Sequence, residues 1–300
     1  MASDVADDPI PLIHGLGALS GRYDAILCDI WGVLHNGHDA FRPASEALAA
    51  FRRNGGTVVL ITNAPRPNPI IRDQALHIGV APEAFDAVVT SGDVAVGMIA
   101  ARGGAPLHHI GPLRDLALIA AVKQRGGVAP ALVEPEKATY ILCTGLFDDK
   151  TETPEDYADR LAAFAERRLP MICANPDLVV HRGHKLVYCA GALAEAYEAL
   201  GGETISAGKP HRPIYTAALE RIAALRGAPV APARVLAIGD ALRTDIIGAR
   251  AVGLDALFVT AGIHSEALHD EDFAIEEEAL QSLFADEKTR PIAAIRMLAP

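Results

Sequence analysis

The 300-residue chain is short of aromatic residues, of basic residues and of long apolar runs. Its formal net charge of -11 argues against a broad basic surface for nucleic acid or anionic lipid. Its longest apolar runs, such as residues 116–122, are far shorter than the roughly 20 residues that a membrane-spanning helix needs. The N-terminus is acidic, whereas a secretory signal is cationic and then apolar. These absences predict a cytoplasmic protein that binds neither a nucleic acid polymer nor a membrane.

Cysteine is also scarce. The four cysteines, Cys28, Cys143, Cys173 and Cys189, are widely spaced in apolar, strand-like segments, and no two form a C-x-x-C pair. The sequence therefore favours buried free thiols over a zinc or redox centre. No G-x-G-x-x-G motif follows the first predicted strand, which disfavours an oxidoreductase with a nucleotide cofactor.

The first and last thirds of the chain repeat one pattern: a short apolar run, a polar or Gly-rich turn, and a helical stretch. In residues 43–54, for example, Ala44, Ala47, Leu48 and Phe51 recur at helical spacing. Alternation of this kind predicts a parallel sheet covered by helices on both faces. The predicted strands are 25–28, 57–61, 87–90, 235–238 and 256–260, and the predicted helices are 43–54, 68–78, 93–102, 213–225 and 245–252.

The middle of the chain has predicted strands and helices of its own. Strands are expected at 140–144, 171–174 and 186–189, and Thr153-Pro154 starts a helix expected at 155–167. The flanking segments complete one another as a single sheet, so we interpret the middle as an inserted domain. The predicted fold class is α/β, with a Rossmann-like, doubly wound parallel sheet core and an inserted α/β domain. The predicted boundaries are 1–94 and 206–300 for the core and 95–205 for the insertion.

Polar residues follow several of the predicted core strands. In open parallel sheets, ligands bind beyond the carboxyl ends of the strands. Asp29 and Asp240, at two such ends, would together hold a hard divalent cation, for which Mg²⁺ is the natural candidate. A threonine hydroxyl from Thr62-Asn63 and the amine of Lys209 would hold phosphate oxygens and counter the charge of a phosphoryl transition state. Asp245 is expected to open a helix beside them.

These segments resemble the four ordered motifs of the haloacid dehalogenase superfamily. The motifs are Asp29-Ile30-Trp31-Gly32-Val33-Leu34, Thr62-Asn63, Gly208-Lys209-Pro210 and Gly239-Asp240-Ala241-Leu242-Arg243-Thr244-Asp245. The long gap between Thr62 and Lys209 leaves room for the α/β cap of class II members. The details are similar to subclass IIA, which contains sugar-phosphate, nucleotide and p-nitrophenyl phosphatases. Asn175-Pro176-Asp177, within the insertion, also fits that subclass.

The resemblance implies a role for each matching residue. Asp29 would attack phosphorus and form an aspartyl-phosphate, with Thr62 hydrogen-bonding the phosphoryl group and Lys209 stabilising its charge. Mg²⁺ would be bound by Asp29, Asp240, Asp245 and the backbone carbonyl of Trp31. Asn63, Asn175 and Asp177 would contact the substrate, a small phosphorylated metabolite. The resemblance is also compatible with a homodimer formed through the cap.

One position departs from the phosphatase pattern. The second aspartate, which protonates the leaving oxygen and then activates water, is replaced by Trp31, the only tryptophan in the chain. Indole cannot exchange a proton near neutral pH, so help worth about 10²- to 10⁴-fold is missing from its normal place. Three interpretations stay open: a phosphatase whose acid lies elsewhere (His35 or His38), a hydrolase of an ester with a good leaving group or of a non-ester bond, or a protein that binds phosphate without turnover. A phospho-accepting signalling receiver is disfavoured by the chain length and the insertion.

Overall fold

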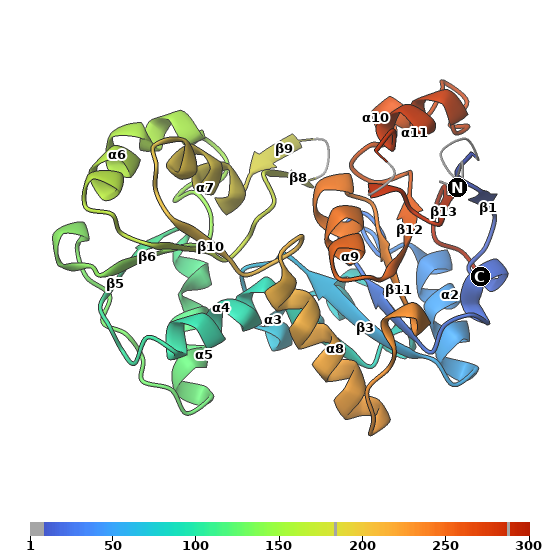
Figure 1. Ribbon diagram of the computed structural model, residues 1–300, viewed down its shortest axis with the longest axis horizontal. Helices are drawn as coiled ribbons and strands as arrows, with labels where there is room; N and C mark the ends of the chain where they lie inside the picture. Colours follow the sequence, from blue (N-terminus) through green and yellow to red (C-terminus); the bar gives the residue numbers. More distant parts are fainter. Residues whose placement is uncertain (1–8, 183–184, 287–288) are drawn as a thin grey trace, which may run out of the picture. The chain divides into compact units, whose positions relative to one another are not determined.

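The computed structural model describes residues 9–182, 185–286 and 289–300. Contacts between residues divide the chain into two compact units, each formed by more than one segment (Figure 1). Unit 1 comprises Met1–Ile61, Ala75–Val88 and Ala218–Pro300, and unit 2 comprises Thr62–Gln74 and Val89–Ala217. The α/β fold class is confirmed, and the domain boundaries at 94/95 and 205/206 stay a prediction.

Unit 1 is built on a seven-stranded sheet, although the last residue of β3 and the last two residues of β4 belong to unit 2. Its strand order is β1-β13-β12-β11-β2-β3-β4, and the pairs whose register is resolved are parallel. After β2, the chain adds strands β3 and β4 on one side, and later β11, β12 and β13 on the other. The strand order therefore reverses between β2 and β11, and ligands bind at such a switch point in doubly wound sheets. The strands are β1 (Leu12–Ile13), β2 (Ala25–Cys28), β3 (Thr57–Thr62), β4 (Ala87–Thr90), β11 (Val235–Gly239), β12 (Asp255–Val259) and β13 (Ala293–Ile295).

The helices of unit 1 follow from the apolar spacing of the sequence. Helix α2 buries Ala44, Ala47, Leu48 and Phe51 on one face, with a proline in its first turn and two arginines in its last. The helices are α1 (Gly17–Ser20), α2 (Arg42–Arg53), α9 (Ile247–Ala251), α10 (Ser265–Leu268) and α11 (Glu277–Leu283), with short turns η1 (Pro82–Ala84), η5 (Pro232–Arg234) and η6 (Leu242–Ile246). Two further helices, α3 (Asn68–Ile78) and α8 (Arg212–Arg226), have residues in both units.

Unit 2 holds a second parallel sheet and a hairpin. The sheet has the order β10-β7-β6-β5, and the hairpin pairs β8 with β9 (Figure 1). The strands are β5 (Leu107–Ile110), β6 (Tyr140–Cys143), β7 (Met171–Cys173), β8 (Val179–Arg182), β9 (Lys185–Tyr188) and β10 (Thr204–Ser206). The helices are α4 (Ser91–Ala100), α5 (Ala117–Gln124), α6 (Ala158–Glu166) and α7 (Ala190–Ala199), with turns η2 (Leu113–Leu116), η3 (Pro135–Lys137) and η4 (Pro154–Tyr157).

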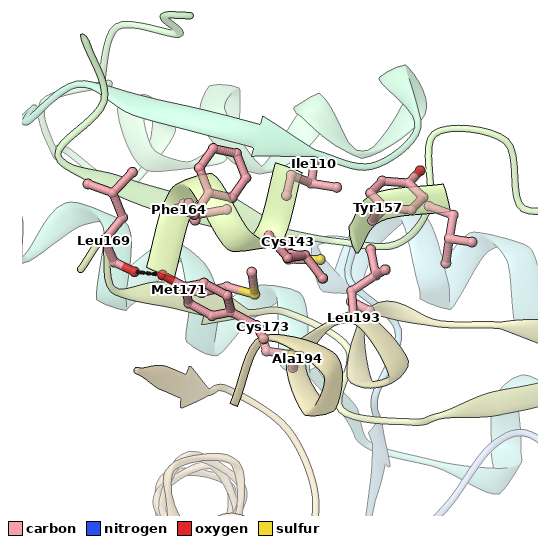
Figure 2. Close-up of a cluster of buried hydrophobic side chains, with 14 residues drawn as sticks. Ile110, Cys143, Tyr157, Phe164, Leu169, Met171, Cys173, Leu193 and Ala194 are labelled. Carbon is pink, nitrogen blue, oxygen red and sulfur yellow. Dashed lines mark hydrogen bonds between the residues drawn. The ribbon is translucent and has the colours of Figure 1, made fainter. Parts of the chain in front are cut away.

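Two apolar cores cover the two faces of this second sheet. Successive residues of a strand point to opposite faces, so Ile141 and Cys143 of β6 enter one core, while Tyr140 and Leu142 enter the other. The first core contains side chains of α6 and α7, and Figure 2 shows its buried members. The second contains side chains of α4 and α5. Helices on both faces of a parallel sheet are the arrangement that the sequence pattern predicts.

Three expected elements have the same bounds in the structure, and the others differ by one to three residues at one or both ends. Strands 25–28 and 87–90 and helix 68–78 have the predicted limits. The helix expected at 245–252 is present as α9, but it begins only at Ile247, because the chain first forms the π-helical turn η6. All four cysteines are free and buried, which confirms that prediction. Among the described residues, no helix combines the length and apolarity needed to cross a bilayer.

Candidate active site

Three buried carboxylates of unit 1 come together at the switch point. One oxygen each of Asp29, Asp240 and Asp245 lies within 4.8 Å of the other two. Asp29 directly follows β2, and its N–H donates to the carbonyl of Ile238 in β11 at 2.8 Å. Asp240 directly follows β11. The parallel pairing of β2 and β11 therefore brings together two carboxylates that stand 211 positions apart in the printed sequence.

The π-helical turn brings in the third carboxylate. The N–H of Ile246 donates to the carbonyl of Ala241 at 3.3 Å, the spacing of a π-helix. Within this turn, Oδ2 of Asp245 accepts a hydrogen bond from the N–H of Ala241 at 3.1 Å. Asp245 thus folds back onto the residue that follows Asp240. The sequence instead predicts that Asp245 opens a helix. Such a widened turn occurs frequently at functional sites.

Two glycines allow the backbone to approach Asp240. A Cβ at Gly32 would lie 2.1 Å from Oδ2 of Asp240, and one at Gly262 would lie 2.0 Å from it. Gly32 has a φ of +79°, a conformation that strains other residues. The same oxygen accepts a hydrogen bond from the N–H of Ile263 at 2.8 Å. The sequence predicts no role for these neighbours of Asp240, although Gly32 stands in the first of the four motifs.

The composition of the cluster fits a hard divalent cation. Its donors are carboxylate oxygens, which Mg²⁺ and Ca²⁺ prefer, whereas zinc sites are built mainly from His and Cys. Asp29, Asp240 and Asp245 are 7%, 6% and 4% exposed, so water screens their mutual repulsion poorly. A bound cation would offset that repulsion, and the site therefore fits the group that the sequence implies.

The side chain of Trp31 packs on the loop that follows it. Its ring lies edge-on to the ring of His35, with 5.1 Å between centroids, and a Cβ at Gly37 would meet the indole at 2.7 Å. His35 is buried, its Nδ1 accepts a hydrogen bond from the N–H of Gly37 at 3.0 Å, and burial lowers the pKa of His35 to about 4. The imidazole is neutral at pH 7, so it does not hold the proton that a general acid must donate. His38, the other predicted candidate, is exposed.

The remaining predicted residues belong to unit 2, where most of them form one hydrogen-bonded group. The side-chain amide of Asn63 bonds both the N–H and the carbonyl of Lys209, and also Oδ1 of Asp177. Asn175 accepts a hydrogen bond from the N–H of Asp177 at 3.2 Å, which closes the 175–177 turn. Thr62 is buried at the end of β3, and its hydroxyl oxygen accepts from the N–H of Ala64 at 3.2 Å. Unit 2 therefore brings together Asn63, Asp177 and Lys209, which the sequence places far apart.

Comparisons with known proteins identify the family. A haloacid dehalogenase-like hydrolase model matches residues 26–123, and a HAD-hydrolase-like model matches residues 206–283. The crystal structure of a hydrolase of the haloacid dehalogenase-like family from Brucella suis 1330 is 45% identical, with a TM-score of 0.83, covering 96% of this chain and 100% of that one. The chain therefore belongs to the haloacid dehalogenase-like hydrolase family. It is a hydrolase, and its resemblance to the class IIA phosphatases of that family is confirmed.

Two more distant relatives carry more specific names. The ribonucleotide monophosphatase NagD of Escherichia coli (strain K12) is 26% identical over 243 residues, which cover 80% of this chain and 88% of that protein. The glycerol phosphate phosphatase Rv1692 from Mycobacterium tuberculosis, solved in complex with magnesium, is 24% identical with a TM-score of 0.65, covering 92% of this chain and 76% of that one. The second likeness establishes a common fold.

Proposed function

We propose that the chain is a Mg²⁺-dependent phosphatase of a small phosphorylated metabolite, such as a sugar phosphate or a nucleotide. The observation that carries this proposal is the cluster of three buried carboxylates at the switch point of the sheet. A cluster made only of oxygen donors suits Mg²⁺, and the magnesium complex of the mycobacterial relative is consistent with that ion. The names of the two phosphatases support the substrate class.

In this proposal, each residue acts as the family resemblance implies. A carboxylate oxygen of Asp29 attacks phosphorus, the bond from phosphorus to the leaving oxygen breaks, and an aspartyl-phosphate remains. Thr62 donates a hydrogen bond to the phosphoryl group, and the ammonium of Lys209 counters its negative charge. Asp29, Asp240, Asp245 and the carbonyl of Trp31 would hold Mg²⁺, which neutralises charge on the phosphoryl oxygens when it is bound. Asn175 and Asp177 belong to the segment that would select the substrate, and a homodimer is part of the same proposal.

The residue at position 31 sets a condition on the substrate. Because indole cannot donate a proton at neutral pH, the leaving oxygen must depart without general acid help from Trp31. The lowered pKa of His35, which packs against Trp31, argues against that residue as the acid. We therefore expect sugar phosphates and nucleotides, which are alkyl esters, to react slowly, and phosphate esters whose leaving group is stable as an anion, such as an aryl oxide, to react much faster. The ratio of the rate on aryl esters to the rate on alkyl esters should be about 10²- to 10⁴-fold larger than in a phosphatase that has the general acid.

A phosphate-release assay tests the proposal. The purified chain is incubated with a panel of aryl, glycosyl, nucleoside and alkyl phosphates, with and without Mg²⁺, and the Asp29→Asn variant serves as the control. We expect release that requires Mg²⁺, is absent in the variant and is fastest for aryl phosphates. Tight binding of inorganic phosphate with no release from any ester would instead identify a phosphate-binding protein. If the chain hydrolyses a bond other than a phosphate ester, and Asp29→Asn abolishes that activity, the result would support Asp29 as the nucleophile but contradict the proposed phosphatase activity.

A further inference from the structure

We infer that Asn63 is a positioning residue that fixes the backbone of Lys209, and that its amide is not a ligand of the substrate. The inference rests on the role proposed above for Lys209. It replaces the substrate contact that the sequence suggested for Asn63 with an action through another residue of the site. All of the residues involved belong to unit 2.

The hydrogen bonds of Asn63 are the basis for this inference. Its Oδ1 accepts from the N–H of Lys209 at 2.7 Å, and its Nδ2 donates to the carbonyl of Lys209 at 3.0 Å. One amide thus bonds both backbone groups of a residue 146 positions away in the chain. Nδ2 also donates to Oδ1 of Asp177 at 2.9 Å. An asparagine has two N–H donors, and these two bonds use both of them, so neither is left for a substrate.

Asp177 determines which way the amide faces. If the amide of Asn63 were rotated by half a turn, its oxygen would face the carboxylate of Asp177 and the carbonyl of Lys209. Each of these contacts would then join two acceptors, and the N–H of Lys209 would face an NH₂ group. In a buried site each such unmade hydrogen bond is unfavourable, because the buried polar groups lose their partners without gaining water. Asp177 therefore selects the orientation in which the amide of Asn63 matches the backbone of Lys209.

The packing around Lys209 leaves little room for another arrangement. Asn63 and Lys209 are each 2% exposed. A Cβ on the preceding residue, Gly208, would lie 2.3 Å from Oδ1 of Asn63 and 2.8 Å from both Pro176 and Ser91. The backbone at 208–209 is thus enclosed by the segments that contain Asn63, Ser91 and Pro176. Asn63 bonds the backbone of Lys209, and Ser91 and Pro176 enclose that of Gly208, so the point from which the Lys209 side chain extends is also held.

This arrangement has a consequence for catalysis. A lysine that counters developing charge acts best when it is held in place before the reaction, and a displacement of about 1 Å can cost about 100-fold in rate. Loss of the Asn63 amide should therefore lower kcat and leave KM nearly unchanged. A direct substrate ligand would behave differently, because its loss raises KM when the ground state and the transition state are bound equally.

The kinetic test uses p-nitrophenyl phosphate with saturating Mg²⁺. We expect Asn63→Ala to lower kcat by about 10- to 100-fold with KM within about threefold of the wild type. In a chain that already carries Lys209→Ala, adding Asn63→Ala should cause no further loss, because Asn63 acts through Lys209. The matched control is Asn68→Ala, which removes another side-chain bond between an asparagine and an aspartate in unit 2, from Nδ2 of Asn68 to Oδ1 of Asp93 at 3.3 Å. A rise in KM with unchanged kcat, or losses that multiply in the double variant, would overturn the inference.

A second measurement does not depend on turnover. In protein labelled with [¹⁵N]lysine, the Lys209 amide resonance is assigned by its disappearance in Lys209→Arg. We expect it to move upfield in Asn63→Ala, since its short hydrogen bond is lost, and to stay in place in Asn68→Ala. The isosteric Asn63→Asp places two carboxylates together, and combining it with Asp177→Asn should partly restore kcat. If the Lys209 resonance does not move in Asn63→Ala, the inference is contradicted even if the proposed phosphatase activity is found. If the resonance moves but the wild type shows no turnover, the positioning role of Asn63 is supported and the proposed phosphatase activity is rejected.

Discussion

Substituting alanine for Gly32 should damage the metal site through a single methyl group. In the structure, a Cβ at this position would lie 2.1 Å from Oδ2 and 2.6 Å from Cγ of Asp240. Real Cβ contacts are essentially never shorter than 3.0 Å, so the carboxylate and the loop must separate by about 1 Å. Mg²⁺ demands near-ideal octahedral geometry with oxygen ligands at about 2.0–2.1 Å. A displacement of that size would therefore remove Asp240 from the coordination sphere of the Mg²⁺ that we propose.

The size of the effect follows from two contributions. Alanine at a φ of +79° costs about 1–2 kcal/mol in backbone strain alone. Displacing Asp240 also breaks its 2.8 Å hydrogen bond from the N–H of Ile263, and such a bond to a charged group contributes about 1.5–3 kcal/mol. We expect Gly32→Ala to lower the free energy of unfolding by about 2.5–5 kcal/mol, the sum of the two contributions. Its Mg²⁺ affinity should fall at least about tenfold, the order found when groups that orient metal ligands are removed.

The matched control is Gly55→Ala. Gly55 has a φ of +88°, and no atom of the described residues comes within 4 Å of its ideal Cβ, so this variant isolates the backbone strain. Mg²⁺ affinity is measured by calorimetry on metal-free protein, and the free energy of unfolding is measured by urea denaturation. We expect Gly55→Ala to lower the free energy of unfolding by about 1–2 kcal/mol and to bind Mg²⁺ with the affinity of the wild type. Equal Mg²⁺ affinity in Gly32→Ala and Gly55→Ala would refute the reasoning.

Two further predictions concern proton transfer and pH. Trp31→Asp supplies the missing acid, so its rates on alkyl phosphates should rise by about 10²-fold or more while those on aryl phosphates change little; a parallel change for both ester types, measured across a series of leaving groups, argues against the role given to position 31. In unit 2, burial raises the pKa of Asp115 to about 6, against the guanidinium groups of Arg114 and Arg66, which lower it. The folded-state pKa of Asp115 lies above its ordinary value of 3.8, so its contribution to the free energy of unfolding is fully present below about pH 4 and is lost as the pH rises through about 6. At about 1.4 kcal/mol per unit of pKa shift, this loss amounts to about 3 kcal/mol. Asp115→Asn should remove this pH dependence, and a wild-type-like slope of unfolding free energy between pH 4 and 7 in the variant would contradict it.

The sequence predicts the fold best where strands are buried on both faces. The residues of β2, Ala25–Cys28, and those of β4, Ala87–Thr90, are all buried, and such strands read as uninterrupted apolar runs. Strand β5 was not predicted, because two histidines occupy the middle of Leu107–Ile110 and interrupt the apolar pattern. The π-helical turn η6 was missed as well, since no spacing rule separates a widened turn from the start of an ordinary helix.

Residues of the candidate site can be predicted from the sequence where the end of a single strand determines where the residue lies. Asp29 and Asp240 were found because each follows a recognisable strand, and the paired strands then bring them together. The contacts of Asn63 could not be found in this way, because they join side chain and backbone across 146 positions and depend on how loops fold. The role of Gly262 beside Asp240 is of the same kind, because a close approach leaves no periodic pattern in the sequence.

The most direct test of the central claim is to trap the phosphorylated Asp29. Wild-type protein is mixed with Mg²⁺ and p-nitrophenyl phosphate and then quenched with borohydride, which reduces an aspartyl-phosphate to homoserine. Peptide mass spectrometry then locates the modified residue. We expect homoserine at position 29, dependent on both Mg²⁺ and substrate and absent from Asp29→Asn. Sustained phosphate release in the same sample, with position 29 unmodified or with the change at another carboxylate, would contradict the account.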